Sequence, residues 1–234
     1  MELREATWTD AEAADTDLAV LPVGSTEQHG PHAPLGTDVE TARAVAEAGV
    51  DAFGDEAVVA PPIPVGVAEE HRHFAGTLWV SEDTFRDYVR ETVAALAHHG
   101  WDRVVVVNGH GGNVSPLREV CGRITRHDDA YAVPFTWFEA VDAPDMGHGG
   151  PVETSALLAL GAAVREDRLD EAADGAADGW GEWQSGVNLA YDSAEFSENG
   201  TVGDPRAASA ERGAELLDEA AAALADLLER VGER

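Results

Sequence analysis

The sequence predicts an α/β fold, specifically a three-layer α/β/α sandwich built around a mainly parallel sheet. The first observation is that short apolar runs alternate with longer segments of helical periodicity along the chain. The second is the run "RVVVV" at residues 103–107. Continuous β-branched residues are typical of a strand that is buried on both faces, as strands of parallel sheets are.

The elements follow in order from these patterns. Strands are expected at residues 18–23, 57–60, 103–107 and 131–136. Helices are expected at residues 39–53, 81–99, 115–126, 153–160 and 207–231. Ser81 is suited to cap the second helix and Gly100 to end it. The stretch 170–204, rich in Gly, Asp, Trp and Asn, is left as a lid, an oligomer contact or a surface loop. A length of 234 residues suits one domain that spans 1–234.

The charge balance excludes several classes of partner. The chain has 45 acidic residues against 15 basic ones, all of them arginine, for a net charge of −30. Such a surface repels nucleic acid and anionic membranes, and it is typical of salt-adapted proteins. A single cysteine, Cys121, excludes an internal disulfide and a cysteine-rich zinc module. The polar N-terminus and the lack of a long apolar run predict a cytoplasmic protein without a membrane span.

Three glycine-rich loops that contain histidine follow predicted strands. They are "GSTEQHGPH" after residue 23, "NGHGGN" after residue 107 and "GHGGPVETS" from residue 147. In open parallel sheets the functional loops lie beyond the carboxyl ends of the strands. We therefore expect these loops to meet at one edge of the sheet.

Five side chains of these loops could bind a metal. Glu27 and His29 are two residues apart, so an extended segment points both the same way. Asp38 begins a helix, whose positive end favours an ionised carboxylate, while His110 lies between glycines and Glu153 enters another helix. Two imidazoles and three carboxylates suit Zn, Mn or Fe(II), and a carboxylate can bridge two ions. Two ions about 3.5 Å apart could activate a water and polarise a carbonyl.

Other catalytic schemes have weaker support. The G-x-S-x-G frame of a nucleophile elbow is absent, and "NGHGGN" lacks the spacing of a dinucleotide loop. His71 and His73, in "EEHRHFAGT", could line a substrate pocket or simply occupy a turn. We take His73 as the candidate substrate-binding residue.

The blocks "LPVGSTEQHGPHAPLGTD", "HFAGT", "VNGHGGN", "HGGPVETS" and "NGTVGDPRAASAERG" together resemble the creatininase family of amidohydrolases. They occur in order over nearly the whole chain. The resemblance implies a three-layer fold, two divalent metals, hydrolysis of non-peptide C–N bonds, and often a homo-oligomer such as a hexamer. It also implies roles for single residues. By position the metal ligands are Glu27, His29, Asp38 and His110, with Asp38 as the bridge. His148 matches a proton shuttle, and Glu153 an active-site glutamate.

Two departures from the family pattern stand out. Creatinine-hydrolysing members carry a metal-binding glutamate where this chain has Gly112, so Glu153 is expected to supply that carboxylate unless only one metal binds tightly. Such members also place two tryptophans around the substrate. Trp137 matches one of them, but Pro144 stands at the other position, which puts creatinine in doubt.

Several functions remain open within this resemblance. The favoured substrate is a formylamino-ribosylaminopyrimidine phosphate of flavin or deazaflavin biosynthesis, because the acidic composition suits an archaeal source. Arg72 and Arg206 are candidates to bind its phosphate. The alternatives are creatinine and the peptide precursor of a redox cofactor. A non-catalytic metal-binding protein is the alternative from another class.

The net charge generates a prediction about salt. Self-repulsion at −30 destabilises the folded state, and added salt screens it. Between roughly 0.1 M and roughly 2 M KCl we expect Tm to rise, since about 2 kcal/mol of relieved repulsion corresponds to roughly 4–8 °C at this chain length. Calorimetry measures Tm, with sucrose of matched osmolality as the uncharged control. A Tm that does not respond to KCl would contradict the prediction.

Overall fold

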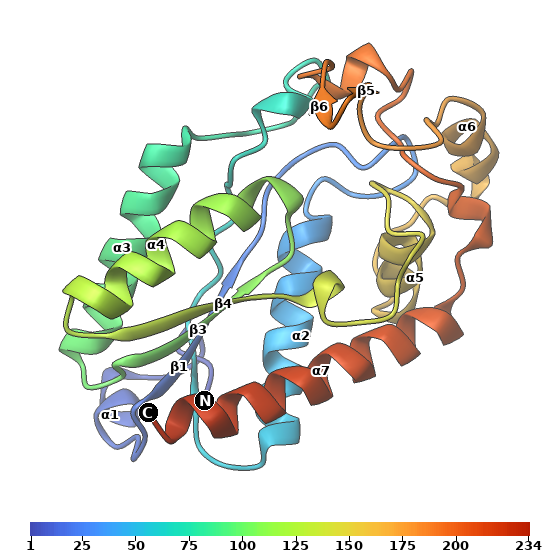
Figure 1. Ribbon diagram of the computed structural model, residues 1–234. Helices are drawn as coiled ribbons and strands as arrows, with labels where there is room; N and C mark the ends of the chain where they lie inside the picture. The colour runs from blue at the N-terminus through green and yellow to red at the C-terminus, as the bar shows by residue number, and fades with distance from the viewer.

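A computed structural model describes residues 1–234 and shows a four-stranded parallel sheet (Figure 1). The strands are β1 (Leu18–Val23), β2 (Val58–Val59), β3 (Arg103–Asn108) and β4 (Tyr131–Thr136), in the order β2-β1-β3-β4. In register, Val20 pairs with Val105, and Val105 pairs with Val133. The prediction of a mainly parallel sheet is confirmed.

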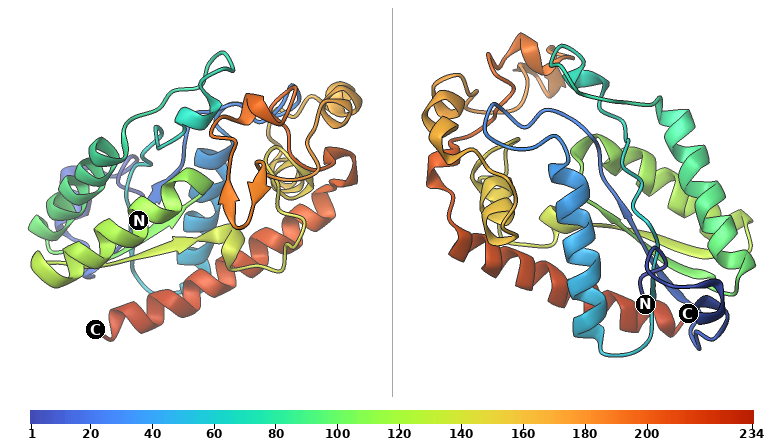
Figure 2. Two further views of the ribbon diagram at one scale, coloured as in Figure 1. Left: turned by 45° about the horizontal axis from the view of Figure 1, so that its top comes forward. Right: turned by 180° about the vertical axis from the view of Figure 1, so that it is seen from behind.

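Helices cover both faces of this sheet (Figures 1 and 2). One face packs against α2 (Thr37–Phe53), α5 (Pro151–Ala159) and α7 (Ala210–Gly232), and the other against α3 (Glu82–His98) and α4 (Val114–His127). The run in β3 serves both cores, because successive side chains of a strand alternate between faces. Val105 and Val107 enter the first core, whereas Val104 and Val106 enter the second. The three-layer architecture is therefore confirmed.

The helix ends show which local signals were readable in the sequence. Ser81 caps α3, accepting a hydrogen bond from the Thr84 N–H at 3.3 Å, and Gly100 follows with a positive φ of 97°. By contrast, α2 begins at Thr37, two residues before the predicted start, after Gly36, which makes no side-chain cap. The earlier start places Asp38 inside the first helical turn, with its carboxylate near the positive end of the helix.

The remaining elements are short. They are α1 (Trp8–Glu12), α6 (Leu169–Asp174), and the strands β5 (Trp183–Gln184) and β6 (Val187–Asn188), which form a two-stranded antiparallel ribbon. Several 3₁₀ turns connect the elements, including Glu69–His71, Gly111–Asn113 and Ser193–Glu195. In Figure 1 the segment that contains β5 and β6 lies at the end of the molecule to which the carboxyl ends of the strands point. No helix is both long enough and apolar enough to cross a lipid bilayer.

The contact between α5 and α7 depends on a glycine. A Cβ atom at Gly213 would overlap the carbonyl oxygen of Ser155, which belongs to the backbone of α5 and cannot rotate away. We therefore expect Gly213→Ala to lower the free energy of unfolding by about 1–3 kcal/mol through overpacking. Urea denaturation measures the change.

Gly232→Ala on the same helix is the matched control. The added methyl there meets Leu18 at an ordinary 3.5 Å. Equal stabilities of the Gly213→Ala and Gly232→Ala proteins would contradict the proposed close approach of the two helices.

Candidate metal centre

The loops at the carboxyl end of the sheet bring six predicted site residues together. Glu27 and His29 follow β1, Asp38 lies in the first turn of α2, and His110 follows β3. His148 and Glu153 come from the loop before α5 and from its first turn. All six are buried. Their convergence follows from the parallel topology, because loops at the same ends of neighbouring strands share one edge.

Glu27, Asp38 and His110 form a first group. Nδ1 of His110 lies 3.1 Å from Oε1 of Glu27 and 3.3 Å from Oδ2 of Asp38. The ligand atoms of these three residues all lie within 4.8 Å of one another. Two carboxylates and one imidazole in this arrangement suit a divalent ion.

His29 and Glu153 form a second group with His148, since the ligand atoms of these three residues lie within 4.8 Å of one another, and His29 also contacts the other oxygen of Asp38. Nε2 of His29 lies 3.0 Å from Oδ1 of Asp38 and 3.6 Å from Oε1 of Glu153. Asp38 therefore faces His110 with one carboxylate oxygen and His29 with the other.

Backbone carbonyls fix the tautomer of each of these imidazoles and of His148. The far nitrogen donates a hydrogen bond in each ring: Nε2 of His110 to the Val67 carbonyl at 2.6 Å, Nδ1 of His29 to that of Glu27 at 3.2 Å, and Nε2 of His148 to that of Gln28 at 2.6 Å. In a neutral ring with this tautomer, the nitrogen that faces the cluster carries a lone pair that a metal can bind. Such outer contacts orient metal-binding histidines in general.

Several buried polar atoms at the centre have no hydrogen-bond partner, which fits a bound cation. They are both carboxylate oxygens of Glu27, Oδ2 of Asp38 and Nε2 of His29. Leaving such atoms unpaired is costly unless something compensates them. Because the atoms are all lone-pair donors aimed at a shared space, a divalent metal meets that need.

The pKa shifts of the clustered side chains also indicate that positive charge is favoured at this site. Burial raises the pKa of Glu27 to about 7, although His110 opposes the shift. Burial would also raise the pKa of Asp38, but His29 and His110 outweigh it and lower that pKa. Burial would lower the pKa of His29, yet Asp38 and Glu153 hold it well above its ordinary value. The buried carboxylates therefore favour positive charge at the cluster, whether on an imidazole or on a bound cation.

Gly112 leaves no room for the glutamate that other sequences place there. A Cβ atom at Gly112 would overlap the carbonyl oxygen of Val67 and would lie 2.6 Å from Nε2 of His110. Glu153 instead reaches the second group with Oε1, while its Oε2 accepts a hydrogen bond from the Gly149 N–H at 2.6 Å. That this carboxylate on α5 replaces the one absent at Gly112 is an expectation from the sequence that metal content tests.

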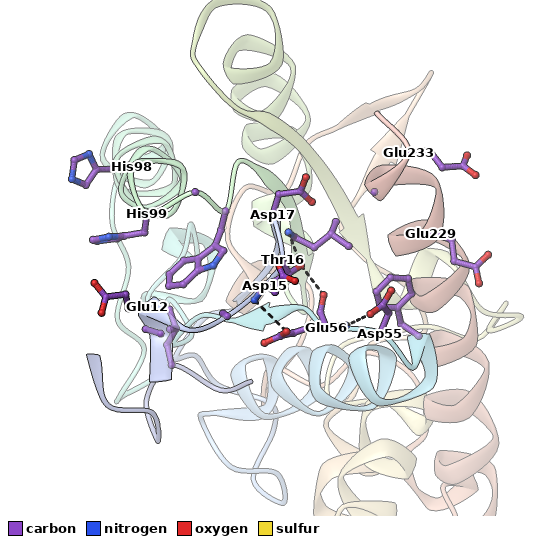
Figure 3. A pocket seen from close by; sticks show the side chains of 18 of the residues that line it. Glu12, Asp15, Thr16, Asp17, Asp55, Glu56, His98, His99, Glu229 and Glu233 are labelled. Atoms are coloured by element: carbon purple, nitrogen blue, oxygen red, sulfur yellow. Dashed lines mark hydrogen bonds between the residues drawn. The ribbon is translucent and has the colours of Figure 1, made fainter. Parts of the chain in front are cut away.

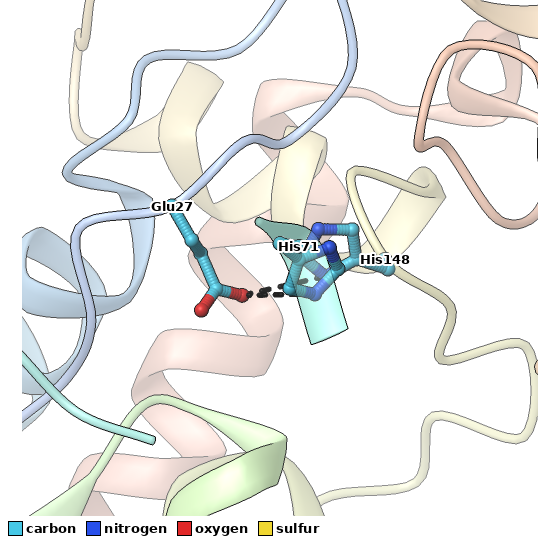
Figure 4. Close-up of side chains that lie close together, drawn as sticks. All are labelled: Glu27, His71 and His148. Atoms are coloured by element: carbon cyan, nitrogen blue, oxygen red, sulfur yellow. Dashed lines mark ion pairs between the residues drawn. The ribbon is translucent and has the colours of Figure 1, made fainter. Parts of the chain in front are cut away.

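Three imidazole rings stack beside the two groups. His148 lies between His29 and His71, with ring centroids 4.3 Å apart on each side. Figure 4 shows His148 and His71 facing the carboxylate of Glu27. Nδ1 of His148 is 3.8 Å and Nε2 of His71 is 3.5 Å from Oε1 of Glu27. Burial lowers the pKa of His148 to about 4, and it also lowers that of His71, so both rings are neutral near pH 7.

A cavity of about 710 Å³ opens onto this cluster. Its wall includes Glu70, His71, His110, Met146 and Trp180. A larger hollow, of about 1350 Å³, lies at the opposite end of the sheet among Asp15, Asp17, Glu56 and other acidic side chains (Figure 3). None of the clustered site residues lines that hollow. The smaller cavity is therefore the candidate substrate site.

Neither residue expected to bind substrate lines this cavity. Trp137 is fully buried in the core beneath α2 and α7, because its ring packs with the apolar side chains of that face. His73 has a half-exposed side chain, and its Nε2 pairs with Oδ2 of Asp192 at 3.1 Å. Instead, His71 and Trp180 line the cavity. Trp180 packs edge-on against His71, with ring centroids 5.6 Å apart. Pro144, which replaces the second family tryptophan, does line the cavity.

The sequence only partly indicated that His71 and Trp180 would line the cavity. His71 and His73 are both histidines of one short turn, and the 3₁₀ geometry of Glu69–His71 decides which of them turns inward. Trp180 lies in the irregular stretch 170–204, where no periodicity indicates direction.

A parallel α/β sandwich with buried carboxylates and imidazoles at the carboxyl edge of its sheet defines an α/β protein with a candidate metal centre in the loops beyond its strands. The family model described as creatininase (creatinine amidohydrolase) matches residues 4–228. The chain belongs to the creatininase family.

Two relatives with named activities are similar to this chain over two thirds or more of its length. The mycofactocin precursor peptide peptidase of Mycolicibacterium smegmatis is 36% identical over 226 residues, covering 91% of this chain and 85% of that protein. The creatinine amidohydrolase of Pseudomonas putida is 31% identical over 186 residues, covering 67% of this chain and 70% of that protein.

Solved structures share the fold. A mutant creatininase of Zn–Zn type superposes with a TM-score of 0.85 at 27% identity, covering 100% of this chain and 98% of that one. A manganese creatininase gives the same TM-score and identity and covers 100% and 99%. These neighbours are zinc or manganese proteins, and the residue groups described above are candidates to hold such ions here.

Proposed function

We propose that the protein is a metal-dependent hydrolase that cleaves an amide C–N bond in a peptide-like substrate, using two divalent ions. The observation that carries this proposal is the division of Asp38 between two ligand groups, with one carboxylate oxygen on each. Glu27, Asp38 and His110 would hold one ion, and His29, Asp38 and Glu153 the other. Zinc and manganese suit these ligands, and so does Fe(II).

The ions, when bound, would lower the pKa of water and polarise the carbonyl of the substrate. The protein contributes a proton carrier, His148. Its Nε2–H is committed to the Gln28 carbonyl, and its Nδ1 faces the cluster as a bare lone pair. Burial, and next His29, lowers the pKa of His148 to about 4, so the ring is neutral near pH 7 and its Nδ1 is unprotonated. His148 would take the proton of the attacking water at Nδ1 and deliver it to the departing nitrogen.

The charge of the cavity supports a peptide-like substrate over a phosphorylated one. No arginine lines the cavity, whereas Glu70, Asp178 and other carboxylates do. Arg72 and Arg206, the two arginines considered for phosphate, form ion pairs with Asp192 and with Asp204. A phosphate dianion would meet repulsion there, in a protein of net charge −30. The formylaminopyrimidine phosphate is therefore the less favoured candidate.

Creatinine is also less favoured than a peptide. Trp137 lies in the core and Pro144 stands on the cavity wall, so a pair of tryptophans does not enclose the cavity at these positions. The relative that covers most of this chain among those named above is a precursor peptide peptidase. A peptide amide is consistent with both the wide cavity and that relative.

The role of Glu153 generates a prediction about metal content. We expect zinc-reconstituted wild-type protein to hold two ions per chain and the Glu153→Gln protein to retain one, because the first group does not use Glu153. Elemental analysis after dialysis measures the count, and Glu166→Gln, on an exposed turn, is the matched control. A Glu153→Gln protein with two tightly held ions would contradict the assignment.

Substrate class is tested by turnover on a panel. It contains short peptides, creatinine, and formylaminopyrimidines with and without phosphate, assayed at high salt with Zn²⁺ or Mn²⁺. We expect metal-dependent cleavage of a peptide amide. We also expect His110→Ala to lose about 100-fold or more in activity together with its metal, since a ligand of the first group is lost.

The other outcomes separate the alternatives. A turnover that requires the phosphate of the formylaminopyrimidine would replace the peptide proposal. Bound metal without hydrolysis of any compound would indicate a non-catalytic metal-binding protein. Full metal content and full activity in His110→Ala would overturn the metal centre itself.

A further inference from the structure

His71 differs from the other three imidazoles of the centre in the direction of its hydrogen bonds. His29, His110 and His148 each donate outward to a backbone carbonyl. His71 instead contacts the side-chain amide of Gln28, whose Nε2 lies 2.8 Å from Nδ1 of the ring. Whether this contact donates or accepts decides which nitrogen of His71 carries the proton.

The surroundings of Gln28 fix the orientation of its amide. Its Oε1 accepts a hydrogen bond from the Gly30 N–H at 2.9 Å. Its Nε2 donates to the Gly200 carbonyl at 3.1 Å, which requires an N–H at that position. Nε2 must therefore donate to His71 as well. Ser193 Oγ, 3.0 Å from the same ring nitrogen, is a hydroxyl that can donate to it or to the Glu70 carbonyl, so it does not oppose this assignment.

The proton of His71 consequently lies on Nε2, the nitrogen that faces Glu27. Since Nδ1 accepts a hydrogen bond, the ring could ligate a metal through Nε2 only as an imidazolate anion. A neutral ring has an N–H there instead. Although Glu27, His71 and His148 lie close enough together to suggest a third metal group, this tautomer argues against His71 as a ligand.

The N–H of His71 also has no partner within the protein. Nε2 is 3.5 Å from Oε1 of Glu27 and makes no hydrogen bond. The ring stacks on His148 with centroids 4.3 Å apart, and Trp180 packs against both rings, 5.6 Å from His71 and 5.9 Å from His148. It forms part of the wall of the 710 Å³ cavity. The Nε2–H of His71 is thus a donor beside the ligand cluster, on a ring of the cavity wall, that makes no hydrogen bond with a protein group.

We propose that His71 is a catalytic residue that donates a hydrogen bond from Nε2, as a neutral imidazole, to the carbonyl oxygen of the scissile amide, with Gln28 holding it in that tautomer. The proposal rests on the proposed amide hydrolysis. A preorganised neutral donor strengthens its hydrogen bond as negative charge develops on that oxygen, so it stabilises the transition state more than the substrate.

The tautomer is tested directly by ¹⁵N NMR of the imidazoles, in metal-free and zinc-loaded protein, with the His71 signals assigned by their loss in His71→Gln. We expect an Nε2–H tautomer in both forms. Gln28→Glu replaces the amide donor by an acceptor, so it should move the proton of His71 to Nδ1. Gln184→Glu, on the exposed strand β5, adds the same charge and should leave the tautomer unchanged. An Nδ1–H tautomer, or zinc bound at Nε2 of His71 in the unaltered protein, would overturn the proposal.

The role in turnover is tested with the peptide substrate that the panel identifies. We expect His71→Phe to lower kcat by about 100-fold at nearly constant KM, with both metal ions retained. His71→Gln restores an N–H near the original position and should recover most of that loss. His98→Gln, an exposed histidine at the other end of the molecule, is the control and should match wild type. Loss of metal from His71→Phe, or equal defects in the Phe and Gln variants, would refute the donor role.

These readouts separate the two levels of inference. If the protein hydrolyses no compound of the panel, the proposed function fails, while NMR still decides the tautomer of His71. If hydrolysis is found and His71→Phe folds poorly, Gln28→Glu tests the same donor with the ring in place. Wild-type kcat in a Gln28→Glu protein whose His71 has changed tautomer would show that the N–H is not used.

Discussion

The structure of the site depends on the burial of two carboxylates, Glu27 and Asp38, at the carboxyl ends of the strands. Buried acids are unstable unless positive charge compensates them, and here imidazoles surround them at hydrogen-bonding distances. Their position requires that the loop after β3 pack directly on the first turn of α2. Gly109 permits this, because a side chain there would overlap the backbone carbonyl of Asp38.

The same constraint explains why backbone atoms hold the rings. A histidine that serves as a ligand must present a lone pair, so its second nitrogen needs a fixed acceptor outside the cluster. The carbonyls of Val67 and Glu27 provide those acceptors for His110 and His29, and the carbonyl of Gln28 does the same for His148, the proposed proton carrier. One side chain, the amide of Gln28, provides a donor instead. The group that contacts the outer nitrogen of each imidazole therefore decides which ring nitrogen carries the proton. The neutral ring has the same net charge in either tautomer.

Most of the fold could be predicted from the sequence because its strongest signals are local. The strands 18–23 and 131–136 agree with β1 and β4, since apolar runs of that length have few alternative structures. The start of α2 was misplaced because Gly36 carries no capping side chain to mark it. The convergence of the three loops could be anticipated from parallel topology alone. His71 and Trp180 could not be identified in this way, because their directions are set by a 3₁₀ turn and by contacts between segments more than a hundred residues apart.

The ligand groups and part of the cavity wall come from different parts of the chain. Every member of the two ligand groups precedes residue 160, whereas Asp178, Trp180 and Val202 of the later segment line the cavity. That segment also contacts the centre directly: Ser193 contacts His71, Gly200 contacts Gln28, and Val202 exchanges two backbone hydrogen bonds with His148. Substrate range can therefore diverge by exchange of cavity-lining side chains within that segment, while its contacts with the centre and the two ligand groups are kept. A peptide peptidase and a creatinine amidohydrolase among the relatives are the kind of diversity that such a modular arrangement permits.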